Sequence, residues 1–399
     1  MNSRQRVRAV LNREIPDRVP FGLGGAETTG LHLLAYSKLN EILGLDIMPR
    51  LDTFMANAVF EKETIHKMQG DMILLASPHM CTSPLWGKGY EAQWKQQQLW
   101  GKTFRVPIAD KFVKDENGAL LWNDWLICPE GSLYFDGPGT TDFYADIEVP
   151  DPSTFNPSHE IDEKTLRALE DTAKELYEET DLSISCGETI TDLQVQPCGF
   201  IGTLILTKEE PEIMHEYLTK CTDAGIAQLK QLDQAIGKYT DMLLIAHDLG
   251  DNRAVTMGAD PWREIYKPHY KRLLGEWKRI SNMKVSMHSC GAISDVLPDL
   301  IECGVDVYNP VQTSAEGMSA ASLKERFGKD IIFYGGAYDT QSILPDTSYD
   351  AVYDTVKDNI KTLMQGGGYI AAGVHNLPGD LPKEHLRAIL DAFYAVREY

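Results

Sequence analysis

From about residue 160 onward, short apolar runs alternate with longer segments whose apolar residues recur at helical spacing. One such segment is Glu163–Thr180, whose apolar positions are Leu166, Leu169, Ala173 and Leu176. This spacing predicts an amphipathic helix. The apolar runs are about five residues long, as is typical of strands buried on both faces of a parallel sheet. The pattern therefore predicts repeated strand–helix units.

Eight apolar runs are candidate strands, two near the start of the chain and six in its repeating part. They are Val19–Leu23, Met72–Leu75, Leu182–Cys186, Met242–Ala246, Lys284–His288, Val305–Tyr308, Ile331–Gly335 and Tyr369–Gly373. Further helices are predicted over Pro211–Ala235, Pro261–Ser281, Ile293–Glu302, Ser319–Phe327, Ser348–Met364 and from Pro382 onward. Eight parallel strands match a closed (β/α)8 TIM barrel, and a doubly wound sheet is the alternative. We favour a single α/β barrel over residues 1–399.

The stretch over residues 80–157 interrupts this rhythm. It is rich in aromatic residues and glycine, and three short alternating pieces predict hairpins: Thr103–Val106, Leu120–Trp122 and Ser132–Phe135. We interpret the stretch as a β-rich insertion after the second strand, lying over the carboxyl ends of the strands. It is either a surface subdomain or a lid that lends aromatic walls to a site. The aromatic residues concerned are Trp86, Trp94, Trp100, Trp122, Trp125, Tyr134 and Tyr144.

The charge balance narrows the range of possible binding partners. With 38 Lys and Arg against 59 Asp and Glu, the net charge is −21, which disfavours binding to nucleic acids and anionic membranes. No run approaches a membrane span of about 20 apolar residues, and the charged start does not resemble a signal peptide. The seven scattered cysteines include no CxxC pair, so no disulfide framework is expected. We expect a cytoplasmic protein with small-molecule or protein partners, and the sequence allows a homodimer.

Catalytic groups of an α/β barrel follow the carboxyl ends of its strands. The polar residues at these places include Glu27, Glu188, His247, Asp248, Asp251, His288, Cys290, Asn309, Gln312, Asp339, His375 and Asn376. In His288-Ser-Cys290, imidazole and thiolate point the same way and suit zinc, with a third ligand from His375 or Asp248. A buried, inert cysteine is the alternative interpretation. The carboxylates after His247 either cap a loop or contact substrate or metal.

Several segments, in this order, resemble one family. They are Arg4–Val7, Pro16–Pro20, Asp248–Gly250, Met287–Gly291, Asn309–Gln312, Gly335-Gly336 and Gly368–Ile370. Together they look like the uroporphyrinogen decarboxylase superfamily, most of all its branch related to corrinoid-dependent methyltransferases. The resemblance implies a single barrel. It also implies a zinc ion held by a His-x-Cys pair and a later Cys, and a corrinoid protein that docks at the barrel mouth. His288 and Cys290 match the pair, and His375 lies nearest to the position of the missing Cys.

The resemblance to true decarboxylases is weaker in the N-terminal segment that binds substrate in those enzymes. Those enzymes use no metal and hold a polycarboxylate with an Arg-rich N-terminal segment, whereas Phe21–Thr29 contains no Arg. A mouth bearing Glu27, Glu188 and Asp248 is acidic where a polycarboxylate needs cations. Porphyrinogen decarboxylation is therefore disfavoured.

These observations lead to one hypothesis with two alternatives. The hypothesis is a zinc-dependent, corrinoid-dependent methyltransferase of the O-demethylase type, which moves a methyl group between a small methylated compound, with a phenyl methyl ether favoured, and a corrinoid protein. In this hypothesis zinc is held by His288 and Cys290, which match the family's pair, and by His375, the nearest candidate for the ligand that replaces the missing Cys. Glu188, His247 and Asp248 are the candidate catalytic residues, as proton donor, ligand or support. The alternatives are a metal-free decarboxylase of a smaller acid and a non-enzymatic corrinoid or tetrapyrrole binding protein.

Overall fold

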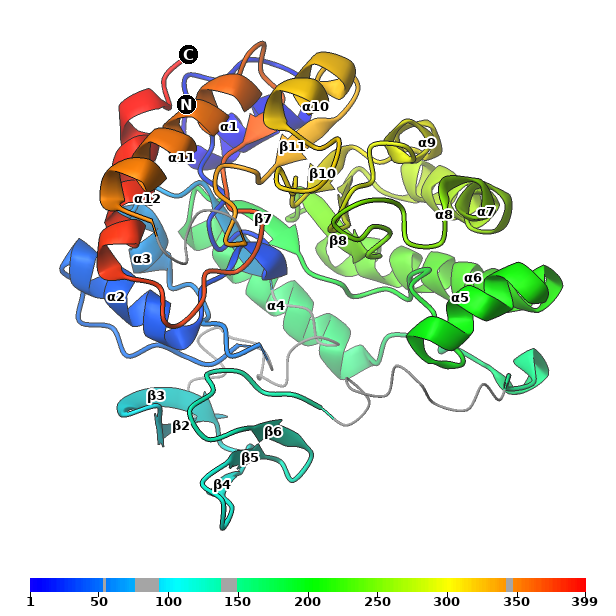
Figure 1. The fold of residues 1–399 in the computed structure, drawn as a ribbon, viewed down its shortest axis with the longest axis horizontal. Coiled ribbons are helices and arrows are strands. Elements are labelled where there is room, and N and C mark those ends of the chain that lie inside the picture. Colours follow the sequence, from blue (N-terminus) through cyan, green and yellow to red (C-terminus); the bar gives the residue numbers. More distant parts are fainter. Residues whose placement is uncertain (53–54, 76–92, 138–148, 342–346) are drawn as a thin grey trace.

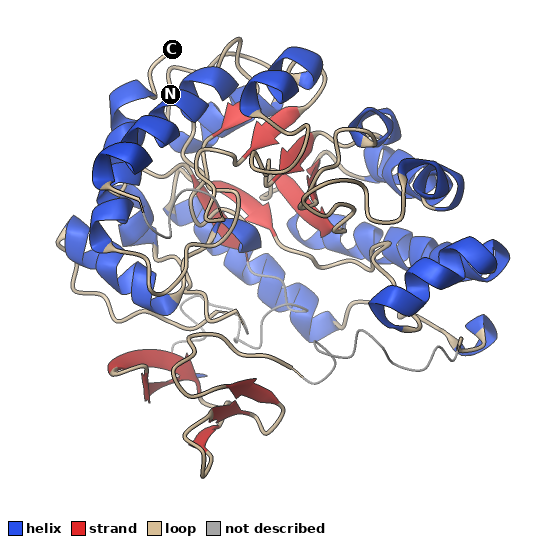
Figure 2. Ribbon diagram, in the orientation of Figure 1, coloured by secondary structure: helices blue, strands red, loops and turns tan. Residues whose placement is uncertain are grey.

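A curled parallel sheet forms the centre of the protein and helices surround it, as the computed structural model shows (Figures 1 and 2). The structure describes residues 1–52, 55–75, 93–137, 149–341 and 347–399. Seven strands follow one another in the sheet in sequence order, and each neighbouring pair is parallel. They are β1 (Met72–Leu75), β7 (Ser183–Cys186), β8 (Met242–Ala246), β9 (Lys284–His288), β10 (Val307–Asn309), β11 (Ile332–Tyr334) and β12 (Tyr369–Ile370).

The segment predicted as the first strand, Val19–Leu23, joins the two edges of this sheet. The Gly22 N–H donates to the Ala371 carbonyl beside β12 at 2.8 Å. On its other side, the Phe21 carbonyl accepts from the Asp71 N–H beside β1 at 2.9 Å. The segment thus takes the place of an eighth strand, although it forms only an isolated bridge rather than a full ladder. The predicted (β/α)8 barrel is confirmed, and the doubly wound alternative is wrong because the sheet closes.

A buried carboxylate stabilises this junction between the two edges of the sheet, which we call the seam. Asp71 is fully buried and accepts hydrogen bonds from the guanidinium groups of Arg6 and Arg18 at 2.6 and 2.7 Å, and from the Phe21 N–H at 2.7 Å. Arg6 also binds Asp17 at 2.7 Å. The N-terminal segments that carried part of the family resemblance therefore hold the barrel closed. A buried carboxylate such as Asp71 is stable only while its charged donors, Arg6 and Arg18, remain in place.

The helices cover the outside of the sheet. Their bounds are α1 (Ser3–Leu11), α2 (Leu33–Leu43), α3 (Lys62–Lys67), α4 (Glu163–Glu179), α5 (Gly199–Glu209), α6 (Pro211–Ile236), α7 (Ala259–Ile265), α8 (Lys267–Ile280), α9 (Leu297–Cys303), α10 (Ala320–Phe327), α11 (Tyr349–Leu363) and α12 (Lys383–Val396), with short 3-10 turns at Glu27–Thr29 and Pro152–Thr154. In α4 the predicted apolar face is buried at Leu169, Ala173 and Leu176. Among the described residues, no helix is both long enough and apolar enough to span a membrane.

Helices α1, α2 and α3 lie outside the segments that were predicted as helices, and two further differences have a clear physical reason. The single helix expected over Pro261–Ser281 is broken into α7 and α8, because Pro268 has no N–H to donate to the Glu264 carbonyl and its ring clashes with that turn. Helix α5 was not predicted. Its sequence is apolar almost all round and leaves Phe200 and Ile205 exposed, so it lacks the periodic pattern from which helices are identified.

The predicted insertion forms two small antiparallel sheets. Strands β2 (Trp94–Leu99) and β3 (Lys102–Pro107) make one, and β4 (Phe112–Lys114), β5 (Leu120–Trp122) and β6 (Leu126–Cys128) make the other. The strand predicted at Ser132–Phe135 is absent, and those described residues form a loop. Residues 76–92 and 138–148, with Trp86 and Tyr144, lie outside the described residues, so the bounds 80–157 stay a prediction.

The aromatic residues of the insertion mostly pack against one another. Trp122 is fully buried, with its ring 5.2 Å from that of Phe112 and 5.3 Å from that of Phe135. The insertion contacts the loop after the first strand, where the His32 ring bonds the Leu133 carbonyl at 2.9 Å. It also contacts the loop after the last strand, where the Gly379 N–H donates to the Tyr134 hydroxyl at 3.2 Å. In Figure 2 its strands stand apart from the central sheet. These contacts favour a surface subdomain over an aromatic lid.

Candidate metal centre

Three predicted ligands meet at the carboxyl ends of β9 and β12. His288 is the last residue of β9, Cys290 follows two residues later, and His375 lies in the loop after β12. Their ligand atoms all lie within 4.8 Å of one another, and Cys290 Sγ is 3.5 Å from His288 Nε2. Within the described part of the chain, no second cluster of three such residues exists. The structure therefore brings together the whole predicted ligand set.

The donor set and its spacing fit zinc. Zinc binds imidazole nitrogen at about 2.0–2.1 Å and thiolate sulfur at about 2.3 Å, so a nitrogen and a sulfur in one tetrahedral site lie about 3.5 Å apart. The Cys290–His288 separation already has this value. Two imidazoles and one thiolate also leave the fourth position open, as in catalytic rather than structural zinc sites.

A buried amide sets the proton position on His288. His288 Nδ1 lies 2.8 Å from Asn309 Oδ1. The amide orientation is fixed because Asn309 Nδ2 donates to the Tyr334 carbonyl at 3.0 Å, and Oδ1 also accepts from the Thr28 hydroxyl at 2.7 Å. The oxygen can only accept, so Nδ1 carries the proton and Nε2, beside Cys290, keeps its lone pair. Such a partner on the other ring nitrogen is characteristic of metal-binding histidines.

His375 completes the cluster as a neutral imidazole. Burial, together with the nearby His288, lowers its pKa to about 4. Burial and the adjacent Asp248 carboxylate raise the pKa of the Cys290 thiol. A cation entering here would therefore find the neutral imidazole of His375 and would displace the thiol proton of Cys290.

Asp248 lies at the rim of the cluster. Its Oδ1 accepts from the Cys290 N–H at 2.8 Å and is 3.6 Å from His288 Nε2, while 57% of the side chain is exposed. Of the two candidates for third ligand, the three-residue cluster contains His375 and not Asp248. Asp248 thus supports the Cys290 loop. Asp251 only caps a turn, accepting from the Arg253 and Ala254 N–H groups.

Glu188 forms part of a carboxyl pair that sequence reasoning missed. Burial, then the charges of Asp192 and Asp248, raises the pKa of Glu188 to about 8, and burial raises that of Asp192 to about 6. Both carboxyl groups lie near the Ala246 backbone at the end of β8. Glu188 therefore holds a proton at neutral pH. Asp192 follows the same strand as Glu188, but four residues further on, beyond the positions considered at strand ends.

His247 is not part of the metal cluster. Its Nδ1 lies 2.9 Å from the Tyr270 hydroxyl and its ring packs on Tyr266, with ring centroids 5.2 Å apart. Burial lowers its pKa to about 4, so the ring is neutral. His247 forms the wall of a pocket rather than part of the cluster.

That pocket, which we call the side pocket, is lined in part by Asp248, whose carboxylate binds the Cys290 N–H at the rim of the cluster. It is open to solvent and holds about 190 Å³ of free space. Its lining consists of Gln194, Val195, Gln196, Phe200, Thr203, Leu204, His247, Asp248, Leu249, Thr256, Met257 and Tyr266. The lining is mostly apolar and aromatic, with neutral amides and hydroxyls and one carboxylate.

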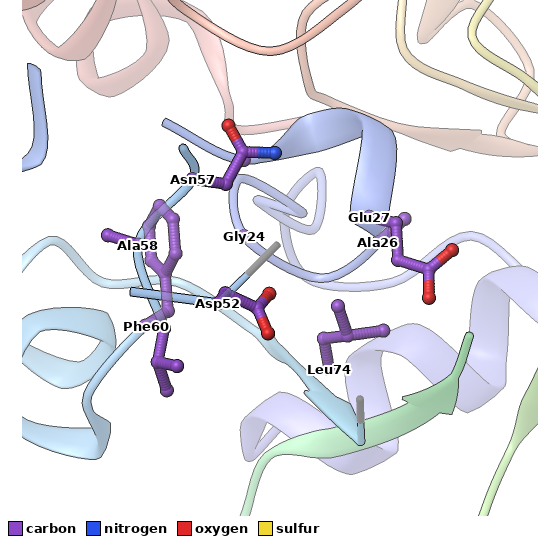
Figure 3. A pocket seen from close by; sticks show the side chains of 10 residues that line it. Gly24, Ala26, Glu27, Asp52, Asn57, Ala58, Phe60 and Leu74 are labelled. Carbon is purple, nitrogen blue, oxygen red and sulfur yellow. The ribbon is translucent and has the colours of Figure 1, made fainter. Parts of the chain in front are cut away.

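A second cavity, of about 360 Å³, lies next to the loop after the first strand (Figure 3). Glu27 and Asp52 both line it, together with Asn57 and Phe60. The loop between these residues is tied to the metal centre's side of the mouth, because the Gly30 N–H donates to Asn376 Oδ1 at 2.6 Å. The cavity at Glu27 thus carries two carboxylates, whereas the side pocket carries one.

Asn309 and Gln312 are the positioning residues that the strand-end pattern contained but did not single out. The Gln312 side-chain oxygen accepts from the Gly291 N–H at 2.8 Å, next to Cys290. Gly291 itself has φ +88°, and a side chain there would meet the Gly250 carbonyl at 2.2 Å. Only glycine fits this close approach. No sequence spacing reports such cross-strand contacts, so these roles needed the fold.

Comparison with known proteins supports both fold and family. The sequence model of the family described as uroporphyrinogen decarboxylase (URO-D) matches residues 144–396. No curated protein sequence matches the chain. Among solved structures, a methyltransferase from Methanosarcina mazei is similar at 15% identity, with 99% of each chain covered and a TM-score of 0.59. A glycoside hydrolase family 5 enzyme from Prevotella bryantii B14 shares 11% identity over 59% of this chain and 78% of its own, with a TM-score of 0.36.

Proposed function

The chain belongs to the uroporphyrinogen decarboxylase family, and from this membership and its metal centre we propose a zinc-dependent methyltransferase. It would move a methyl group between a small methylated compound, with a phenyl methyl ether favoured, and a corrinoid protein at the barrel mouth. The observation that carries the proposal is the His288–Cys290–His375 cluster, because a decarboxylase without metal has no need of it. The name of the Methanosarcina mazei structure points the same way. We expect the activity in the cytoplasm.

His288, Cys290 and His375 would hold the zinc. Bound there, zinc supplies a Lewis acid for the methylated oxygen. The chain supplies the rest of the site. Asn309 fixes the His288 ring, and the Asp248 carboxylate holds the Cys290 backbone.

Glu188 is the proposed proton donor. When the methyl group leaves the ether for the corrinoid protein, the C–O bond electrons stay on oxygen and a phenolate results. Glu188, whose pKa is raised to about 8 by burial and nearby carboxylates, gives its proton to that oxygen and becomes a carboxylate. The product is then a neutral phenol. His247, neutral and bound to Tyr270, acts as a wall of the site.

The residues that line the two cavities disfavour a polycarboxylate substrate. Across the described residues, neither the side pocket nor the cavity at Glu27 has a Lys or Arg in its lining. A substrate with several carboxylates needs such cations. This supports methyl transfer over decarboxylation of a tetrapyrrole.

The test is a methyl-transfer assay with zinc-loaded protein, cob(I)alamin and a panel of methoxyarenes, followed by the absorbance of the corrinoid. We expect turnover with at least one donor, and its loss in the His288→Ala/Cys290→Ala double variant. Turnover that survives the double variant would refute the role of the cluster. Silence with every donor, or CO2 release from a small acid by metal-free protein, would refute methyl transfer.

A further inference from the structure

The two histidines of the metal centre come from strands that do not pair with each other. His288 ends β9 and His375 lies in the loop after β12, while β10 and β11 stand between these strands in the sheet. Strand pairing therefore leaves the distance between the two rings to the loops at the barrel mouth. In the structure the ring centroids are 6.1 Å apart and the ring planes meet at 73°. Contacts between loops must hold this arrangement.

One short segment reaches the neighbourhood of both rings. It consists of Thr28–His32, which follow the first strand of the barrel, and we call it the bridging segment. Thr28 is buried, and its hydroxyl donates to Asn309 Oδ1 at 2.7 Å. The same oxygen accepts from the His288 ring at 2.8 Å. One end of the bridging segment is thus fixed to the partner of the first histidine.

The rest of the bridging segment is bound to the residues that follow His375. The Gly30 N–H donates to Asn376 Oδ1 at 2.6 Å, and the Gly30 carbonyl accepts from the Leu377 N–H at 3.0 Å. The His32 N–H donates to the Leu377 carbonyl at 3.0 Å. Of these three hydrogen bonds, the one to Asn376 depends on a side chain. Asn376 is therefore the position at which a substitution can test the contact.

His375 lies between two anchored neighbours. On its amino side, the Val374 N–H donates to the Tyr338 carbonyl at 2.9 Å. On its carboxyl side, the half-buried Asn376 is bound to Gly30. Because the backbone is fixed on both sides, the His375 ring has little freedom to lose when a metal binds, and such preorganisation increases affinity.

The insertion supports the other end of the bridging segment. His32 Nδ1 accepts from the Leu34 N–H at 3.1 Å, so Nε2 carries the proton and donates to the Leu133 carbonyl of the insertion at 2.9 Å. The His32 ring also lies against Gly379, where a Cβ atom would meet Nδ1 at 2.6 Å. The bridging segment is thus held at both ends as well as at Gly30.

We propose that Asn376 is a positioning residue for His375, which it holds against the bridging segment so that the ring stays beside His288 and Cys290. This inference rests on the proposed zinc centre and deepens it. Asn376 acts through the backbone of the loop and does not itself bind the metal. Loss of a residue that orients a metal ligand typically weakens metal affinity by about 10–100-fold.

The test compares variants of Asn376 that differ in the hydrogen-bond acceptor. Asn376→Leu removes the acceptor for the Gly30 N–H at nearly constant size, Asn376→Ala removes it without adding bulk, and Asn376→Asp keeps an oxygen in its place. In competition with a chromophoric chelator, we expect the first two variants to bind zinc about tenfold or more weakly. Asn376→Asp should bind zinc at least as tightly as the wild type. Zinc-edge X-ray absorption should show two imidazoles in the wild type and in Asn376→Asp, and one in Asn376→Leu.

Metal-free protein gives an independent measurement of the same positioning. With carbon-13-labelled histidine, a nuclear Overhauser contact between the His288 and His375 rings should be present in the wild type and in Asn376→Asp. It should be lost in Asn376→Leu and Asn376→Ala, while circular dichroism shows that these variants are folded.

The outcomes separate this inference from the proposed function. Unchanged zinc affinity and an unchanged ring contact in folded Asn376→Leu or Asn376→Ala would overturn the inference, even if the wild type binds zinc. Equal losses in Asn376→Asp would also overturn it, because the acceptor would then not matter. Loss of the ring contact that Asn376→Asp restores would support it. If the wild type then bound no zinc, the proposed function would fail while the positioning of His375 by Asn376 stood.

Discussion

Asn309 should control the affinity of the metal centre without touching the metal. Its Oδ1 accepts from the His288 ring at 2.8 Å and from the Thr28 hydroxyl at 2.7 Å, and the residue is fully buried. Asn309→Leu keeps approximately the size of the side chain but removes the acceptor. The His288 ring could then rotate or change tautomer, and Nε2 would no longer be held ready beside Cys290.

The expected weakening of zinc binding follows from the hydrogen bonds that each substitution removes. Removing a partner of a metal-binding histidine typically weakens metal affinity by about 10–100-fold, which corresponds to about 1.4–2.7 kcal/mol. Thr28→Val is the matched control, because it removes one hydrogen bond to the same Oδ1 and leaves the bond between Asn309 and His288 in place. A single neutral hydrogen bond is worth about 0.5–1.5 kcal/mol, so the control should lose clearly less affinity than Asn309→Leu.

The assay is competition for zinc with a chromophoric chelator, and circular dichroism verifies that each variant is folded. Nitrogen-15 chemical shifts of the His288 imidazole provide a second reading, since they report which ring nitrogen carries the proton. Unchanged zinc affinity in folded Asn309→Leu, with His288 still protonated at Nδ1, would refute the reasoning.

Further predictions concern the seam and the carboxyl pair. Asp71→Asn should lower the free energy of unfolding by about 3–5 kcal/mol, because it leaves the buried Arg6 and the half-buried Arg18 without the carboxylate that they share. Asp17→Asn, at a carboxylate 42% exposed, should cost about 1 kcal/mol or less. Urea unfolding measures both losses, and equal losses would contradict the role of the seam. Glu188→Gln should lower kcat by about 10²–10⁴-fold, because it removes the proposed proton donor. The kcat of the wild-type protein should fall as the pH rises through about 8, where the Glu188 proton is lost. A kcat that does not change with pH would exclude Glu188 as the acid. Because the pKa of Glu188 is raised in the folded state, wild-type stability should also decrease as the pH rises from about 4.5 to about 8, and thermal unfolding of Glu188→Gln should show less of this decrease.

The sequence predicted the barrel because its strands are continuous apolar runs, and each run forms a strand or, at Phe21, a bridge in the closed sheet. Amphipathic helices such as α4 were predicted because their apolar residues recur at helical spacing. Helix α5 escaped because its apolar residues follow no period, and the break at Pro268 was visible in the sequence but was outweighed by the pattern around it.

The metal ligands were predictable because they directly follow strands whose ends must converge. His288, Cys290 and His375 needed only the barrel rule to be placed together. Asp192 and the role of Asn309 were not predictable in this way. The pairing of Asp192 with Glu188 depends on the path of a loop, and the bond from Asn309 to His288 depends on the register of β9 against β10.

The central claim, that His288, Cys290 and His375 bind zinc, is tested most directly by zinc analysis combined with X-ray absorption at the zinc edge. The account predicts about one zinc per chain in protein purified without chelators, with one sulfur neighbour at about 2.3 Å and nitrogen or oxygen neighbours at about 2.0–2.1 Å. Cys290→Ser should remove the sulfur signal, and His375→Ala should weaken zinc retention. Fewer than about one zinc in ten chains, or a zinc environment that neither substitution alters, would contradict it.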